Sequence, residues 1–420
     1  MQKAKSFIIS KHLVMEAWNR IRSNGGSAGI DNQSLKDFEK NLKDNLYRIW
    51  NRMSSGSYMP SPVKLVDIPK NGGGTRPLGI PTVSDRVAQM VVVLLLEPEF
   101  EKVFHQDSYG YRPKRSAHDA LASARQRCWK YDWVLDMDIK GFFDNINHAL
   151  LHKALVRHTK ESWVLLYIKR WLEVPYMRGN KELIERTKGV PQGSVIGPVL
   201  ANLFLHYAFD TWITRNYPMV PFERYADDTI CHCRTQEQAI MMKRVVEERF
   251  RACGLELNET KTKIVYCKDS NRRANFDQIQ FDFLGYTFRP RKAENNAKKC
   301  FLSFLPAISS KAKKKIGETM RSWWQTSRTD RRIEELALWL NPTLQGWINY
   351  YGKFYKSQLN GLFNRLNQRL VIWVTKKYKR FKGRRTRARK WLGIFAKNHP
   401  NLFSHWRFGL RPAKPIELTG

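Results

Sequence analysis

Apolar residues recur along this chain with two different periods, which separate expected helices from expected strands. In residues 1–60 they return at three- and four-residue steps, as at Leu13 and Ala17, and this spacing predicts helices. Asp31 or Ser34 is in position to cap the helix that follows the first glycine turn. Helices are also expected over three later stretches, 84–104, 118–131 and 236–253.

β-Branched and alternating residues predict strands at 64–70, 75–80, 133–139 and 281–288. The first two strands flank Asn71-Gly72-Gly73-Gly74, so they predict a glycine-tipped hairpin that carries Lys70 and Arg76 near its tip. One interpretation is a surface hairpin with solvated charges. The other is a loop whose glycines let the backbone approach a triphosphate, although no helix follows as a P-loop requires.

A third feature is the segment 189–198, which precedes an apolar helix expected near 200–205. It places Gln192 and Gly193 at the mouth of that helix. Because a helix start exposes free amide groups, the segment predicts a floor for a nucleotide or a template base.

Aspartates stand at the ends of two of these patterns. Asp136 and Asp138 share one face of the 133–139 strand, and Asp227-Asp228 form a turn between two later strand-like stretches. Carboxylates on a central strand are costly unless cations offset them, so together they can hold two divalent cations, a geometry that suits phosphoryl transfer at a nucleic-acid end. For Asp136 a solvated strand end is an equal alternative.

Charge changes this picture by indicating the partner. The chain has 74 Lys and Arg against 38 Asp and Glu, a formal charge of +36, so a polyanion is the expected ligand. Because 42% of the residues are hydrophobic, the charge decorates a folded protein. No apolar run approaches the roughly 20 residues that cross a bilayer, so we expect a cytoplasmic protein with no membrane partner.

The six cysteines show no paired zinc-site spacing. Cys231-His232-Cys233 is the one local cluster, and alternate residues of a strand are expected to pack there rather than bind metal. No cysteine follows Cys300, so a zinc-stabilised nuclease module is not expected, and the thiols are expected to be reduced.

Six motifs in order resemble the reverse transcriptases, and within them the group II intron-encoded reverse transcriptase/maturase proteins. These motifs are the glycine hairpin, Tyr109-Gly110-Tyr111-Arg112-Pro113, the 138–144 segment, Pro191-Gln192-Gly193, Tyr225-Ala226-Asp227-Asp228 and Phe283-Leu284-Gly285-Tyr286. The resemblance covers nearly the whole chain. Ser194, where many members have a second glycine, is a small departure from the family pattern.

The resemblance implies a catalytic triad. Asp138, Asp227 and Asp228 match the residues that hold two Mg²⁺ ions, with Mn²⁺ as a substitute, and the Ile139 carbonyl matches an additional ligand. Phe143 matches the gate that excludes a 2′-hydroxyl, which favours Asp138 over Asp136 as the ligand. Asp144 belongs to the same motif without an assigned role.

The resemblance also implies binding residues around the triad. Those for the nucleotide are Lys70, Arg76, Phe143, Gln192 and Lys261. Those for the primer and template are Gly193, Tyr225 and Gly285.

The last third differs in composition, with many basic residues among tryptophans. Between 376 and 390 there are ten basic residues and no acidic ones, interleaved with Tyr378 and Phe381, which predicts an intron RNA or target DNA surface. The alternative is a helical bundle with solvated charges. The candidate contacts are Lys376, Lys377, Lys379, Arg380, Lys382, Arg384, Arg385 and Arg387.

The resemblance implies an α+β right-hand polymerase, with fingers and an antiparallel palm sheet, followed by a helical thumb. The expected divisions are fingers and palm over 1–295, the maturase-specific thumb (domain X) over 296–380 and a short basic nucleic-acid-binding region over 381–420, with no endonuclease domain.

The implied activity is RNA-directed DNA synthesis from dNTPs on an RNA template with a DNA or RNA primer. Group II intron RNA and target DNA are the further implied partners, for assisted splicing and for retrohoming by target-primed reverse transcription. Two alternatives stay open. One is a domesticated reverse transcriptase of a retron, diversity-generating element or phage defence system, and the other is a splicing-only RNA-binding maturase.

Overall fold

The computed structural model describes residues 7–69, 74–179, 182–295, 297–324 and 328–412. Its contacts divide the chain into two compact units, Met1–Ala120 with Trp133–Ile264, and Leu121–Asp132 with Val265–Gly420. This division differs from the expected boundary at residue 295.

The first unit begins with helices whose starts the sequence encodes. The Asp37 amide donates to the Ser34 hydroxyl oxygen, and the Ser34 amide donates to the Asp37 carboxylate. This reciprocal pair is a capping box, so Ser34 and not Asp31 caps α2. Helix α4 is buried over most of its length, as its apolar run predicted. The helices of this unit are α1 (Lys11–Asn24), α2 (Leu35–Lys40), α3 (Leu42–Ser55), α4 (Val83–Glu101), α6 (Phe142–Asn145), α7 (His148–Leu155), α8 (Ser162–Glu173), α9 (Gly197–Leu205), η1 (His206–Asp210), α10 (Thr211–Asn216) and α11 (Gln236–Ala252).

The predicted hairpin is present as β1 (Val63–Pro69) and β2 (Thr75–Ile80), antiparallel with Lys64 opposite Ile80. It belongs to a sheet of order β2-β1-β4-β5, completed by β4 (Tyr176–Met177) and β5 (Leu183–Ile184). The hairpin tip, and with it Lys70, lies outside the described residues.

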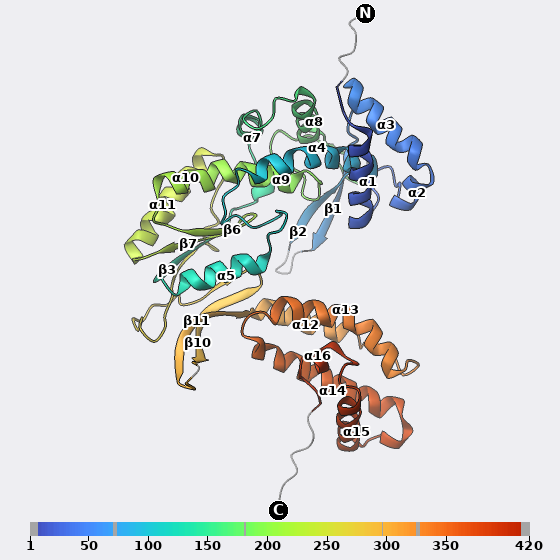
Figure 1. Cartoon of the computed structure of the whole chain (residues 1–420), viewed down its shortest axis with the longest axis vertical. Coiled ribbons are helices and arrows are strands. Elements are labelled where there is room, and N and C mark those ends of the chain that lie inside the picture. The colour runs from blue at the N-terminus through green and yellow to red at the C-terminus, as the bar shows by residue number, and fades with distance from the viewer. Residues whose placement is uncertain (1–6, 70–73, 180–181, 296, 325–327, 413–420) are drawn as a thin grey trace, which may run out of the picture. The chain divides into compact units, whose positions relative to one another are not determined.

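A second sheet has the order β6-β7-β3-β8. Its strands are β3 (Trp133–Met137), β6 (Phe222–Tyr225), β7 (Asp228–Cys233) and β8 (Lys263–Tyr266). The pairs β6–β7 and β3–β7 are antiparallel, and helix α11 lies close to the sheet (Figure 1). Helix α5 (Ala117–Cys128) and strand β8 run through the points where the two units divide.

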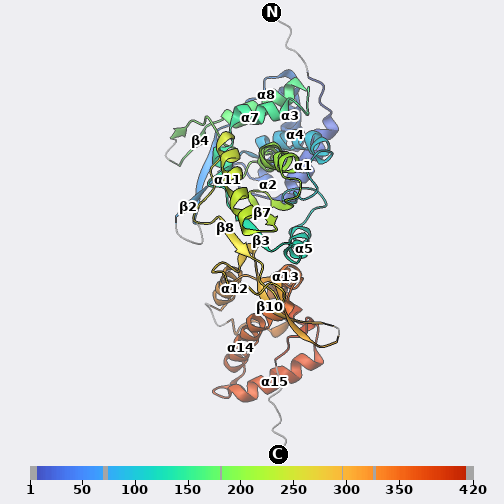
Figure 2. The ribbon, with the colours of Figure 1, turned by 90° about the vertical axis from the view of Figure 1, so that its left-hand side faces the viewer.

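The second unit combines a three-stranded sheet with a group of helices (Figure 2). Its strands, in the order β11-β10-β9, are β9 (Phe281–Phe283), β10 (Tyr286–Glu294) and β11 (Cys300–Ile308). Its helices are α12 (Ser310–Ser322), α13 (Ile333–Tyr351), η2 (Lys356–Leu359), α14 (Asn360–Lys377), η3 (Lys379–Phe381), α15 (Arg385–Asn398) and α16 (Ser404–Arg407).

Hydrogen bonds from tyrosine hydroxyls join the sheet to helix α13. Tyr350 in α13 donates to the Leu284 carbonyl at 2.8 Å, and Tyr286 donates to the Tyr350 carbonyl. The core of this unit also includes Leu392, Phe403 and Trp406, so the C-terminal helices share one core with α12–α14.

The architecture confirms the predicted α+β class, with an antiparallel sheet in the first unit and a helical C-terminal region. No helix among the described residues has the length and apolarity needed to cross a membrane.

Candidate active site

Two strand ends of the β6-β7-β3-β8 sheet bring the candidate carboxylates together. Met137 pairs with Thr229, so continuing this antiparallel register by one residue sets Asp138 opposite Asp228. Residues opposite each other in such a pair have Cβ atoms about 4.5–5.5 Å apart. Asp227 lies in the two-residue turn between β6 and β7, beside Ala226, whose φ of 58° is unusual for a residue with a side chain.

Lys261 neutralises Asp138 in this structure. Its Nζ lies 3.0 Å from Oδ2 and 3.2 Å from Oδ1 of Asp138. The lysine reaches the carboxylate from the segment between α11 and β8. The structure thus places Lys261 beside Asp138, and its role in nucleotide binding stays a prediction.

The other two carboxylates carry unfavourable charge. Burial raises the pKa of Asp227, and Asp138 adds to the rise, while Arg76 and Lys261 oppose it. Asp228 is exposed, but the protein around it still removes much of its water. This desolvation, and to a smaller extent repulsion from Asp227 and Asp138, raises the pKa of Asp228 to about 6. A cation bound between these groups would offset this cost.

The donor chemistry fits a hard divalent cation, which prefers carboxylate and carbonyl oxygens. Ile139 and Leu257 form an isolated antiparallel bridge. Its two backbone bonds lie on either side of Ile139: the Asn258 amide donates to the Asp138 carbonyl at 2.8 Å, and the Lys140 amide donates to the Glu256 carbonyl at 2.9 Å. In this pattern the carbonyl of Ile139 itself points away from Leu257. Within the described residues, no three His, Cys, Asp or Glu side chains already stand in a metal-binding arrangement. Lys261 and a bound cation would share the two oxygens of the Asp138 carboxylate.

A second group of residues links the hairpin to the 189–198 segment. Arg76 Nε donates to Gln192 Oε1, and Gln192 Nε2 lies 3.5 Å from Asp144 Oδ2. The Gly79 amide donates to the Gln192 carbonyl at 2.7 Å. Asp144, for which the sequence gave no role, thus helps to orient the glutamine that bonds Arg76.

Gly193 is required where it stands. Its φ is 110°, and a Cβ there would lie 2.6 Å from the Gly79 carbonyl oxygen. The residue thus allows close packing of this segment on β2, whereas its role in template binding stays a prediction.

Two backbone amides just before this helix are already bonded within the protein. Helix α9 begins at Gly197, after Gln192 and Gly193, and the amides of Val195 and Ile196 donate to Gln89 Oε1 at 2.9 and 3.3 Å. A side chain from α4 therefore caps this helix start, which leaves those two amides unavailable to a nucleotide.

Phe143 lies in the short helix α6 directly after the Asp138 strand. Its side chain is buried, and its carbonyl accepts from the Val190 amide at 2.7 Å. Gly189, at φ 83°, packs so closely on this helix that a Cβ would lie 2.7 Å from the Asp144 carbonyl oxygen. The backbone around Phe143 is therefore fixed from both sides.

The aspartate turn rests on the Tyr-Gly-Tyr segment. Tyr225 and Tyr111 have ring centroids 6.4 Å apart. A Cβ on Gly110 would lie 2.4 Å from the Ala226 amide nitrogen, so only glycine lets the two loops approach this closely. Sequence reasoning noted this motif and missed its structural role.

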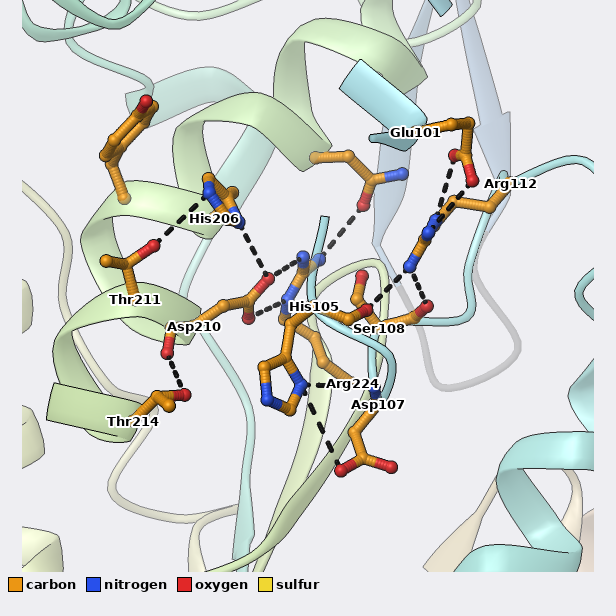
Figure 3. A network of polar contacts seen from close by, with 12 residues as sticks. Glu101, His105, Asp107, Ser108, Arg112, His206, Asp210, Thr211, Thr214 and Arg224 are labelled. Carbon is orange, nitrogen blue, oxygen red and sulfur yellow. Dashed lines mark hydrogen bonds and ion pairs between the residues drawn. The ribbon is translucent and has the colours of Figure 1, made fainter. Parts of the chain in front are cut away.

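A buried network beneath the turn was also missed (Figure 3). Arg224 pairs with Asp210 through two bonds of 2.7 and 2.6 Å, and both side chains are fully buried. Arg224 Nη1 donates to Asn202 Oδ1 at 2.9 Å and to the Ala226 carbonyl at 3.1 Å. The arginine thereby ties the turn to the π-helix η1. Its position next to the aspartates was the only signal in the sequence.

A related cluster holds the preceding loop. Arg112 makes two bonds to Glu101, of 2.9 and 2.8 Å, and Nη1 donates to the carbonyls of His105 and Ser108 at 2.7 Å each (Figure 3). The Tyr109 amide of this loop donates to the backbone carbonyl of Arg224 at 2.8 Å. The motif arginine therefore shapes the loop that supports the turn.

The Cys231-His232-Cys233 cluster is packed into the sheet. Both cysteines are buried and unpaired by disulfides, and His232 Nε2 lies 2.6 Å from Glu223 Oε2. Burial raises the pKa of the Cys233 thiol to about 12, which disfavours the thiolate that a metal needs.

Gly285 lies in the second unit, at the turn between β9 and β10. Its φ is 78°, and a Cβ would lie 3.2 Å from the Tyr351 hydroxyl. The backbone of Ser309 also passes close, since its amide donates to the Gly285 carbonyl at 3.0 Å. Primer binding by Gly285 stays a prediction.

The basic segment spans the end of α14, η3 and the start of α15. Phe381 is buried, and Tyr378 and Phe381 pack against Trp391 at centroid distances of 5.4 and 5.7 Å. These aromatics therefore serve the protein core, which corrects the expectation that they stack on bases. Lys382, Arg384, Arg385 and Arg387 are exposed.

Comparison with known families gives two matches. A model described as reverse transcriptase (RNA-dependent DNA polymerase) matches residues 68–288, more than half of the chain. A model described as group II intron, maturase-specific domain matches residues 313–392.

Individual proteins are similar to parts of this chain. Protein YkfC of Escherichia coli is 29% identical over 57% of this chain and 73% of its own length. The group II intron-encoded protein LtrA of Lactococcus lactis is 32% identical over 48% of this chain, which spans a third of LtrA. A solved telomerase structure from Candida albicans, in complex with a telomeric RNA fragment, aligns over 90% of this chain and 68% of its own, with a TM-score of 0.47 and 10% identity.

Proposed function

The chain belongs to the group II intron-encoded reverse transcriptase/maturase family, with a reverse transcriptase domain over residues 68–288, and from this premise we propose that it copies RNA into DNA and binds group II intron RNA. The observation that carries the polymerase proposal is the sheet register that sets Asp138 opposite Asp228 beside the Asp227 turn. Charge repulsion among these carboxylates supports a cationic ligand.

In this proposal Asp138, Asp227 and Asp228, with the Ile139 carbonyl, hold Mg²⁺. The bound metal supplies positive charge that activates the primer hydroxyl and offsets charge on the triphosphate. The protein's own part is to position: the Arg224 network holds the turn rigid, and Lys261 keeps Asp138 neutralised before nucleotide arrives.

Arg76 and Gln192 form the proposed nucleotide side of the site. Gln192 receives a bond from Arg76 and lies within reach of Asp144, so the guanidinium is held in one orientation. A preoriented cation stabilises developing phosphate charge without reorganising during the reaction. Lys70 is proposed as its partner, and it lies outside the described residues.

Primer extension tests the activity directly. The full chain, a DNA or RNA primer annealed to an RNA or DNA template, dNTPs and Mg²⁺ should give extension on both templates, and EDTA should abolish it. RNA binding without any extension under these conditions would favour the splicing-only alternative.

Phe143 is expected to exclude ribonucleotides. Shortening it in Phe143→Ala should raise ribonucleotide incorporation relative to dNTPs by about 10- to 100-fold, because a pocket contact of this kind contributes about 1–3 kcal/mol of discrimination. Single-nucleotide extension with matched rNTP and dNTP measures the ratio. An unchanged ratio in Phe143→Ala would remove the gate assignment.

The second proposed role is binding of intron RNA, with target DNA as a further partner for mobility. The maturase-specific match over 313–392 supports it, as does the exposed basic segment at the start of α15. A domesticated reverse transcriptase would have no need of this maturase-specific region. A structured ribozyme with splice sites around the coding sequence would support the intron role, and splicing of that RNA in vitro with and without the protein tests it.

The salt dependence of RNA affinity is expected to show whether the basic segment contacts phosphates. Replacing Arg384, Arg385 and Arg387 with alanine should make the slope of log affinity against log salt concentration shallower by about two. Each phosphate contact formed on binding releases about 0.7–0.9 counterions, and the variant loses three such contacts. Filter binding of intron RNA between low and moderate salt measures it. Alanines at the exposed Arg234, Arg244 and Arg251 remove the same charge from the first unit, and an equal change in both variants would show that only net charge matters.

A further inference from the structure

A cavity of about 330 Å³ in the first unit has no part in the site described above. Helices α7, α9, α10 and α11 and the π-helix η1 contribute its walls. Its volume is at the small end of the roughly 300–1,000 Å³ of ligand pockets, so it suits one small ligand.

Part of the pocket lining is apolar or aromatic, and we call this part the apolar floor. Leu150, Ala154 and Phe204 line it together with Tyr207 and Trp212. Such a lining accepts a flat ring, and stacking of a base on an aromatic side chain contributes about 1–3 kcal/mol.

Cations also line the pocket. Lys153, Arg157, Arg215 and Arg249 line the pocket, and none of its described lining residues is acidic. Lys153, Arg157 and Arg215 are exposed and form no ion pair with a described acidic residue. The pocket therefore offers positive charge that the described protein does not neutralise, and it favours an anion.

The π-helix fixes the shape of the pocket. Its wider turn directs the Tyr207 and Ala208 carbonyls toward Arg249, which donates to both at 3.0 Å. The Tyr207 hydroxyl is held by His158 Nε2 at 2.7 Å, and Arg157 lies over the Tyr207 ring at 5.6 Å. Both Tyr207 and Arg249 are thus held in place before a ligand arrives, and π-helices of this kind are frequent at functional sites.

We propose that this pocket binds a single nucleotide, with the base on the apolar floor between Tyr207 and Trp212 and the phosphate at Arg157 and Arg215. The required chemistry is a flat aromatic ring joined to a phosphate. Two sources supply it, a free mononucleotide and an unpaired nucleotide of a bound RNA.

The test titrates the full chain with AMP in EDTA, so that binding at a metal-dependent polymerase site does not contribute. Calorimetry should detect one AMP site, and Arg157→Ala/Arg215→Ala and Ala154→Phe should each weaken binding by about tenfold or more, given the size of stacking and phosphate contacts. Adenosine and inorganic phosphate should each bind more weakly than AMP.

A second arm uses a single-stranded RNA oligomer that carries photoreactive 4-thiouridine. Crosslinks to the peptide that contains Tyr207 and Trp212, lost in Ala154→Phe, identify RNA as the source, whereas AMP binding without crosslinks identifies the free nucleotide. Lys160→Ala is the matched control because Lys160 is an exposed cation near Arg157 that does not line the pocket, and it should behave as the native chain.

Thermal unfolding of each variant confirms that it is folded, and primer extension is measured beside it. Because this activity is measured separately, a failed polymerase proposal leaves the pocket testable. Absence of both AMP binding and crosslinks in the native chain, or equal binding by native and pocket variants, would overturn the proposal and leave the cations as ordinary helix-end charges.

Discussion

Replacing Asp227 and Asp228 together by asparagine should reduce primer extension by about a thousandfold or more, because the metal charge they hold contributes several kcal/mol to the transition state. Asparagine keeps the size of each side chain, so the turn beside Ala226 should persist. The change also removes two charges whose burial, together with repulsion among the carboxylates, raises both pKa values, so the variant should fold at least as stably as the native chain.

The measurement is single-turnover extension on an RNA template, with RNA affinity measured in parallel. Affinity should change little, since cations elsewhere supply most of the phosphate contacts. Asp136→Asn is the matched control, because Asp136 stands two residues before Asp138 on β3 and pairs with Ile230 in the middle of the sheet. Full activity in the double variant, or an equal loss in Asp136→Asn, would refute the assignment of the metal site.

Breaking the Arg224–Asp210 pair should have the second largest effect. Asp210→Asn leaves a fully buried guanidinium with a weaker partner, and Arg224→Met leaves a fully buried carboxylate alone. Removing one partner of a buried ion pair costs about 3–5 kcal/mol, so both variants should lose thermal stability, Arg224→Met more severely. Extension should fall as well, because Arg224 also holds the Ala226 carbonyl of the aspartate turn.

Thermal unfolding of the purified chain measures the first effect, and extension well below the unfolding temperature measures the second. Arg251→Ala is the matched control: its pair with Glu247 is exposed on α11, and such pairs contribute about 0–1 kcal/mol. A variant at the buried pair that unfolds like Arg251→Ala would show that the network does not support the turn.

The sequence by itself determined the elements and the family. Periodicity located α4, the hairpin β1–β2 and helix α11, because these depend on which side chains within a short window are apolar. It also supplied Asp138, Asp227, Asp228 and Lys261 as candidates, and the register and the Lys261 bond bring these four close together. Their catalytic roles stay predictions for the experiments above.

The tertiary structure alone decided which distant residues support the site. Nothing local in the sequence pairs Arg224 with Asp210, places Gln89 on the amides before α9, or sets Gly110 against the aspartate turn. These contacts join residues far apart in the chain, and their strength comes from burial, which only the folded packing creates. For the same reason the sequence pattern predicted that Tyr378 and Phe381 belong to a nucleic-acid-binding surface. In the folded protein both rings pack against Trp391 as part of a core.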